Sequence, residues 1–315
     1  MSEAPVVRMS VDYVSVAAPG QRTNEDLVVA ADRFVLVLDG ATRAPGVDTG
    51  CVHDVSWLVR QLGSQVADVL LNDAGIALAD AVASGIERVR SRHGGTCDLD
   101  NPDSPSSTVA LVRLGSASLD YLVLADSAVV LRSADGAITA VVDDRLDHLP
   151  DFSLETVRKS RNSAGGFWVA STNVDAAYEA ICGSAPLDGL DSVALLSDGV
   201  TRLAERHGWS WSELLDLLAT DLGPSKAVQA VRDADAVAAP PAANRGKPHD
   251  ARRPCCAASP EATQGYRARA PTTKAPPRSG ERGGGFVLRP RGKTGWNEIT
   301  HEVGQNATRR VADHP

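Results

Sequence analysis

The sequence predicts an α+β fold in which most strands are antiparallel. Short apolar runs rich in Val and Leu recur between residues 33 and 196, and each is bounded by Gly, Asp or Ser, as strands commonly are. Two long segments of helical period separate the first run from the second, whereas most later runs follow one another through short turns. Consecutive strands joined by turns favour an antiparallel sandwich over a regularly alternating parallel sheet.

The expected elements follow in order along the chain. Apolar residues at steps of three and four predict a pair of helices over residues 52–69 and 79–89, and the Gly-, Asp-, Pro- and Ser-rich residues 94–107 predict a loop. A third helix is expected at residues 211–218, with Ser210 or Ser212 as its cap. Strands are expected at residues 33–38, 108–114, 119–124, 128–131, 138–142, 167–170 and 192–196.

Charge is distributed unevenly along the 315 residues, whose net charge is −8 at pH 7. Residues 1–250 carry 20 Lys and Arg against 35 Asp and Glu, whereas residues 251–315 carry 12 against 5. An acidic body repels nucleic acids and anionic membrane surfaces and attracts divalent cations, so no nucleic-acid or membrane partner is expected. No apolar run reaches the roughly 20 residues that cross a bilayer, and the N-terminus lacks a secretory signal pattern, so a cytoplasmic location is expected.

The cysteines are odd in number and have no C-x-x-C spacing, which indicates neither a disulfide framework nor a zinc site. They are predicted to be reduced structural thiols: Cys51, Cys97, Cys182, Cys255 and Cys256.

Three apolar runs end in an aspartate that a strand holds in place. V-L-V-L-D-G ends in Asp39 and Gly40, V-L-A-D-S contains Asp126, and A-L-L-S-D-G ends in Asp198 and Gly199. Each D-G pair alone is a common turn dipeptide, but three aspartates of the same form are harder to explain as turns. Carboxylates clustered at one sheet edge suit Mg²⁺ or Mn²⁺, which prefer oxygen ligands.

A charged segment, Q-R-T-N-E-D, precedes the first of these strands and contains Arg22, Glu25 and Asp26. The planar guanidinium of an arginine can hold a phosphate through two hydrogen bonds, and carboxylates can hold metal-bound waters. By itself the segment is more simply interpreted as a solvated charged loop. Together with the strand-end aspartates it indicates metal-assisted phosphoester hydrolysis by a metal-activated water.

The succession of R-T-N-E-D, V-L-V-L-D-G, S-S-T-V-A-L-V, L-A-D-S and A-L-L-S-D-G resembles the metal-dependent serine/threonine protein phosphatases, the PPM or type 2C family, in its bacterial form. The resemblance covers residues 7–250. It implies a four-layer α-β-β-α sandwich with two Mn²⁺ or Mg²⁺ ions at one edge, a phosphorylated protein as substrate, and a role in signalling.

The resemblance also implies individual roles. Asp39 bridges both ions, Gly40 offers its carbonyl to one, and Asp198 binds the second, while Arg22 holds the substrate phosphate. The remaining expected ligands act through water or at an optional third ion: Glu25, Asp26 and Asp126.

Two departures concern catalysis. Ala41 stands where many eukaryotic members have a histidine that protonates the leaving group, and Arg202 stands where an extra acidic ligand often occurs. Neither His53 nor His93 is expected to replace that histidine, because both lie in or beside helical patterns and are predicted to be on the surface.

A third departure concerns the end of the domain. The family usually continues with an Asp that completes the metal site and then a strand, but here His249 and Asp250 are followed by A-R-R-P-C-C. Pro254 removes a ladder donor, so the sandwich is expected to lack a normal last strand. The prediction is therefore a phosphatase-like domain over residues 1–250 and a disordered Pro/Gly/Arg-rich tail over residues 251–315, which is either a regulatory segment or the product of a shifted reading frame.

Three functions remain open at this point. The first is hydrolysis of phosphoserine or phosphothreonine in proteins. The second is a catalytically impaired module that keeps the fold and binds a partner, as Ala41 and the altered end suggest. The third is hydrolysis of small phosphoesters, for which no nucleotide-binding glycine loop is present.

Overall fold

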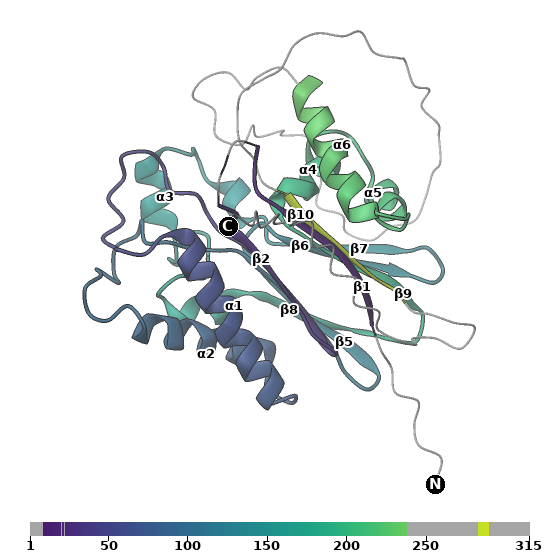
Figure 1. Ribbon diagram of the computed structural model, residues 1–315, viewed down its shortest axis with the longest axis horizontal. Helices are drawn as coiled ribbons and strands as arrows, with labels where there is room; N and C mark the ends of the chain where they lie inside the picture. The colour runs from purple at the N-terminus through teal and green to yellow at the C-terminus, as the bar shows by residue number, and fades with distance from the viewer. Residues whose placement is uncertain (1–8, 20, 22, 238–282, 290–315) are drawn as a thin grey trace, which may run out of the picture.

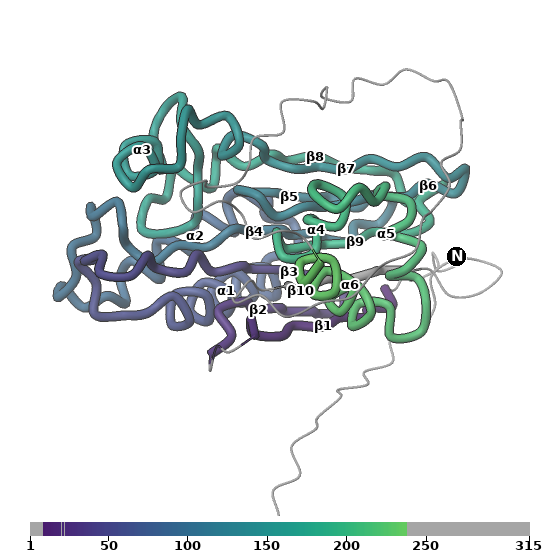
Figure 2. Tube along the Cα trace, turned by 90° about the horizontal axis from the view of Figure 1, so that it is seen from above, coloured from purple at the N-terminus to yellow at the C-terminus, as the bar shows by residue number. Residues whose placement is uncertain are grey.

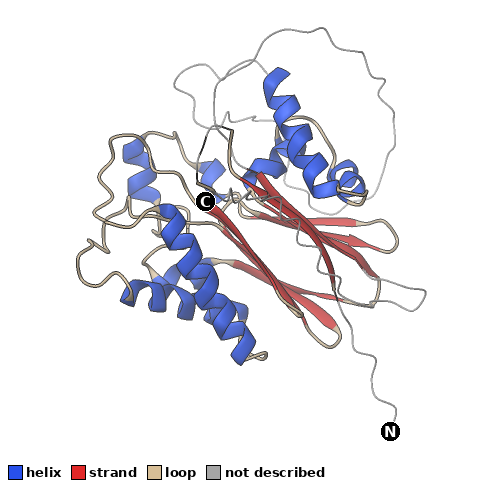
Figure 3. Cartoon of the chain, viewed as in Figure 1, coloured by secondary structure: helices blue, strands red, loops and turns tan. Residues whose placement is uncertain are grey.

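Two antiparallel sheets stack face to face, and helices cover both outer faces (Figures 1 and 3). The computed structural model describes residues 9–19, 21, 23–237 and 283–289. One sheet has the order β2-β3-β4-β5-β8 and the other β1-β10-β9-β6-β7, with antiparallel pairing throughout. The α+β class and the four layers expected from the sequence are thereby confirmed.

The first sheet is built from nearly contiguous chain and is covered by α1 and α2. Its strands are β2 (Asp26–Ala30), β3 (Phe34–Asp39), β4 (Val109–Leu114), β5 (Ser118–Leu124) and β8 (Ile181–Pro186). The helices are α1 (Val55–Asn72), α2 (Leu78–Ser91) and, farther out, the short α3 (Leu154–Ser160). Two short 3-10 helices lie nearby, Arg145–His148 and Val174–Glu179.

The second sheet is covered by three helices from the later part of the chain (Figure 2). Its strands are β1 (Ser10–Val16), β6 (Ala128–Ser133), β7 (Ile138–Val142), β9 (Leu190–Leu196) and β10 (Gly283–Arg289). The helices are α4 (Asp198–Glu205), α5 (Trp211–Leu218) and α6 (Gly223–Val237).

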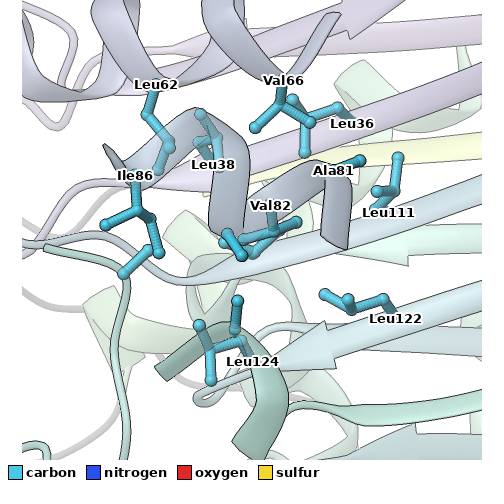
Figure 4. Packing of buried hydrophobic residues seen from close by; sticks show 14 of the residues in the cluster. Leu36, Leu38, Leu62, Val66, Ala81, Val82, Ile86, Leu111, Leu122 and Leu124 are labelled. Atoms are coloured by element: carbon cyan, nitrogen blue, oxygen red, sulfur yellow. The ribbon is translucent and has the colours of Figure 1, made fainter. Parts of the chain in front are cut away.

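Alternate residues of the central strands bury their side chains in different layers. In β3, Leu36 and Leu38 pack under α1 and α2, whereas Val35 and Val37 face the other sheet (Figure 4). A strand covered on both faces must be apolar at every position, which explains the unbroken runs in the sequence. The rigid strand that results ends at Asp39.

Two strand expectations are corrected. Residues 167–170 make single bridges, Arg161 with Phe167 and Ser107 with Ala170, instead of a ladder, so they are not a strand. The expectation that no strand closes the sandwich is also wrong, because β10 lies between β1 and β9 in the second sheet. Asp250, beside the break in the family pattern, lies outside the described residues, as does the rest of the predicted tail apart from β10.

The other expected elements are found close to their predicted places. Residue 210 is the cap of α5, where the Ser210 side chain and Glu213 form a reciprocal capping box. Among the described residues, no helix is both long enough and apolar enough to cross a lipid bilayer.

Candidate functional site

Four aspartates from separate elements meet at one end of the sandwich. Asp39 ends β3, and the strand register places Asp26, the first residue of β2, directly opposite it. Asp198 begins α4, and Asp126 lies between β5 and β6. The pKa of Asp39 is held well above its ordinary value, first by burial and then by the negative charges of Asp198, Asp26 and Asp126. The four carboxylates therefore share one electrostatic environment.

The backbone of Asp39 is fixed by the loop that leads into β4. The hydroxyl of Ser107 donates to the carbonyl of Asp39 at 3.0 Å, and the amide of Thr108 donates to the same carbonyl at 2.9 Å. The Thr108 hydroxyl accepts from the Asp39 amide at 3.3 Å and lies 2.6 Å from the hydroxyl of Ser127. The S-S-T motif, whose role the sequence did not reveal, thus holds the candidate bridging carboxylate in position.

The position of Asp126 depends on an unusual backbone conformation in the residue before it. Ala125 has φ of 64°, a left-handed value that a residue with a Cβ rarely adopts. Asp143 stabilises this turn by accepting the Ala125 amide at 3.2 Å, and Arg145 pairs with Asp143 at 2.7 Å. Asp143 is 2% exposed, so the ion pair is largely shielded from water on the aspartate side. Sequence reasoning missed both residues, since no motif distinguishes them.

The backbone at Gly40 is in close contact with α1 and with the segment before β2. Its amide donates to the carbonyl of Glu25 at 3.1 Å. A Cβ atom there would lie 2.3 Å from Val55 Cγ1 and 2.6 Å from the Glu25 carbonyl oxygen, both too close for real contacts. Glycine is therefore the residue that fits here without a steric clash.

Replacing Gly40 by alanine is therefore expected to reduce the free energy of unfolding by about 1–3 kcal/mol, the usual cost of overpacking. Urea unfolding of the metal-free protein would measure the change. Gly75→Ala is the matched control, because a Cβ there would meet one neighbour at an ordinary 3.5 Å. Equal stability of the two variants would contradict the steric argument.

A buried cation lies beside the aspartates. Arg202, in α4, is 3% exposed and pairs with Asp235 of α6 at 3.3 Å, while His207 lies 2.7 Å from the same carboxylate. Burial lowers the pKa of Arg202, and the charges of Asp235 and Asp198 oppose this shift. Its positive charge offsets part of the local negative charge where the family pattern has an acidic residue.

A groove of about 650 Å³ lies next to the aspartates and is lined by residues from several loops. Glu25 forms part of its wall and accepts a hydrogen bond from the Thr42 hydroxyl at 2.9 Å. Arg43 and Arg161 also line the groove, together with the carboxylates of Glu25, Asp54 and Asp103, so its wall carries charges of both signs.

The structure brings together most of the residues singled out in the sequence. One site contains the four aspartates Asp26, Asp39, Asp126 and Asp198. Beside it, the amide of Gly40 donates a hydrogen bond to the carbonyl of Glu25. The two other candidates, Arg22 and Asp250, lie outside the described residues. The donors present are carboxylate and carbonyl oxygens, and the mutual repulsion at Asp39 is what a hard divalent cation would relieve, so the residues fit Mn²⁺ or Mg²⁺.

The sequence matches the model of a known family over residues 23–233, and the description of that family is Protein phosphatase 2C. The chain belongs to the protein phosphatase 2C family. The match spans the two sheets apart from β1 and β10, and it includes all four aspartates of the site. A comparison with curated protein sequences gave no match.

Several solved structures share the fold of this chain. The catalytic domain of the serine/threonine phosphatase PstP, in complex with 2 manganese ions, is 14% identical, with a TM-score of 0.51 and coverage of 90% of this chain and 99% of PstP. Stp1 of Staphylococcus aureus is 11% identical, with a TM-score of 0.53 and coverage of 92% and 96%. PppA of Pseudomonas aeruginosa is 16% identical, with a TM-score of 0.51 and coverage of 89% and 97%.

Proposed function

We propose that this protein is a cytoplasmic, metal-dependent phosphatase that hydrolyses phosphoserine and phosphothreonine in proteins. The observation that carries the proposal is the buried Asp39 carboxylate, whose pKa is raised by burial and by three neighbouring aspartates. Such a concentration of negative charge at a rigid strand end favours divalent cations. Family membership and the two manganese ions of PstP support the same assignment.

In this proposal Asp39 and Asp198 hold two Mn²⁺ or Mg²⁺ ions together with the carbonyl of Gly40. Asp26, Glu25 and Asp126 act around them, and Asp250 is proposed to complete the second site. When bound, the ions lower the pKa of a water molecule and offset the charge of the phosphate. Ser107, Thr108 and Ser127 keep Asp39 in place during turnover.

The substrate is proposed to lie in the neighbouring groove. Arg22 is proposed to bind the phosphate through its guanidinium. Arg43 and Arg161 supply guanidinium groups in the groove wall beside the carboxylates of Glu25, Asp54 and Asp103. The groove is proposed to take a phosphorylated loop or peptide that extends beyond the phosphate. Ala41 supplies no proton, so the departing alcohol must take its proton from water or another group.

The proposal predicts phosphate release that depends on a divalent cation. A chain treated with EDTA and then dialysed should hydrolyse neither p-nitrophenyl phosphate nor a phosphothreonine peptide, and added Mn²⁺ should restore both activities. Release of p-nitrophenol without any action on peptides would favour the small-phosphoester alternative. Mn²⁺ binding by calorimetry without turnover would favour the binding module, which Ala41 and the altered chain end motivate.

A further inference from the structure

A cluster of two thiols and one imidazole lies in the groove wall, apart from the aspartates. Cys51 and His53 belong to the segment between β3 and α1, and Cys97 belongs to the loop that follows α2. The two sulfur atoms are 3.5 Å apart, and Nδ1 of His53 lies 3.6 Å from each of them. Residues remote in sequence thus form a nearly equilateral triangle of metal-binding atoms.

The dimensions of this triangle match a tetrahedral zinc site. Zn–S bonds of about 2.3 Å and Zn–N bonds of about 2.0–2.1 Å, at tetrahedral angles, place two sulfurs about 3.8 Å apart and a sulfur and a nitrogen about 3.6 Å apart. Two of the three edges equal the ideal value, and the third is shorter by a few tenths of an ångström. A disulfide would require the sulfurs at about 2.05 Å.

Backbone amides donate hydrogen bonds to both sulfurs. The amide of His53 donates to Cys51 Sγ at 3.4 Å, and the amide of Val52 donates to Cys97. The thiol of Cys51 donates to Cys97 Sγ at 3.5 Å.

The imidazole is also held in a form that can act as a ligand. Its ring stacks on Trp57 with centroids 3.8 Å apart, and His93 meets it edge-on at 5.1 Å. These two ring contacts fix the orientation of the His53 imidazole. His93 itself is 4% exposed, so its expected surface position is wrong.

The two segments that carry the ligands are joined next to the cluster. The Asp98 amide donates to the carbonyl of Gly50 at 2.8 Å, which brings the residues beside Cys51 and Cys97 together. Asp54 caps α1 by accepting the Trp57 amide at 2.7 Å and so fixes the turn that holds His53. These hydrogen bonds hold the backbone of both segments in place, so the three side chains start from fixed positions.

We propose that Cys51, Cys97 and His53 form a zinc site that fastens the loop after α2 to the groove wall. Cys51 and His53 line the groove, and water is proposed as the fourth ligand. Binding of Zn²⁺ releases the thiol protons and leaves two thiolates and one neutral imidazole as ligands. The site is separate from the Mn²⁺ or Mg²⁺ site because it uses soft ligands instead of carboxylates.

Co²⁺ titration of the full chain under reducing conditions tests the site. The background is the triple variant C182S/C255S/C256S, in which Cys51 and Cys97 are the remaining cysteines. One equivalent of Co²⁺ should give a thiolate charge-transfer band and tetrahedral d–d bands, and Zn²⁺ should remove both. Adding Cys51→Ser or Cys97→Ser should abolish the bands, whereas Asp39→Asn should leave them intact whether or not the protein is a phosphatase.

Alkylation of the unmodified sequence gives a second measurement that does not depend on any variant folding. Zn²⁺ should protect Cys51 and Cys97 from iodoacetamide, as mapped by mass spectrometry, but not the exposed Cys182. Absence of both the bands and the protection in reduced protein would overturn the proposal. Bands that survive Cys51→Ser would also overturn it, as would a Cys51–Cys97 disulfide whose reduced form takes up no metal.

Discussion

Replacing Asp39 by asparagine is expected to reduce Mn²⁺-dependent phosphate release by about 10²- to 10⁴-fold, the rate equivalent of several kcal/mol. The amide has the shape of the carboxylate but lacks the charge proposed to hold both ions. Hydrolysis of a phosphothreonine peptide at saturating Mn²⁺ measures the loss. Asp188→Asn is the control, because this exposed residue lies between β8 and β9, at the opposite end of β9 from Asp198.

The same substitution should stabilise the protein when no metal is present. The folded-state pKa of Asp39 is raised, so the favourable contribution of its protonated form is complete below the unfolded-state pKa and is lost as pH rises through the folded-state value. At neutral pH the burial and charge repulsion of the Asp39 carboxylate destabilise the folded, metal-free protein, whereas the neutral amide of the asparagine variant avoids this penalty. A lower melting temperature of metal-free Asp39→Asn at pH 7 would contradict the electrostatic account, and activity close to that of the unmodified chain would contradict the proposed role.

Ending the chain at residue 250 is expected to abolish cooperative unfolding. β10 pairs with β1 over seven residues, from Ser10 with Arg289 to Val16 with Gly283, and its other side pairs with β9. Among the described strands β1 has no other neighbour in its sheet, so removal of β10 detaches β1 and exposes an edge of β9. Thermal denaturation followed by circular dichroism, together with the soluble fraction after expression, measures the effect.

A shorter deletion separates the strand from the remaining residues beyond the domain. A chain that ends at residue 289 keeps β10 and should melt cooperatively, close to the full chain. If the chain that ends at residue 250 unfolds with the same midpoint as the full chain, β10 contributes nothing to the sandwich.

The apolar pattern predicted the elements whose burial is two-sided. β3 is wholly buried, and most residues of β4, β6 and β9 and the second half of β5 are buried too, so their apolar runs stand out in the sequence. β1, β2 and β8 are edge strands with partly exposed residues, and the pattern did not reveal them, although it did predict the edge strand β7. Residues 167–170 have a strand-like composition, but the backbone there bonds at isolated residues, a tertiary arrangement that local composition does not record.

The sequence predicted those site residues that directly follow a buried strand, because the apolar run of the strand marks their position. Asp39, Asp126 and Asp198 could be found because apolar runs precede them. Asp143 could not be found in this way, because its role is to accept a hydrogen bond from the amide of Ala125, which lies 18 residues away in the sequence. Cys51 and Cys97 could not be joined by spacing rules either, because a tertiary contact between two loops brings them together across 46 residues.

The placement of β10 between β1 and β9 has a consequence for the order of events during synthesis. The sheet made of β2, β3, β4, β5 and β8 draws on residues 26–186, a stretch interrupted by β6 and β7 of the other sheet, and it can form with α1 and α2 while translation continues. β1 emerges first, yet the strand that pairs with it is made near the end. Pairings so remote in sequence are slow to close. The second sheet therefore stays incomplete until β10 has been synthesised, and the edges of β1 and β9 remain unpaired. We expect the nascent chain to depend most on chaperones during that interval.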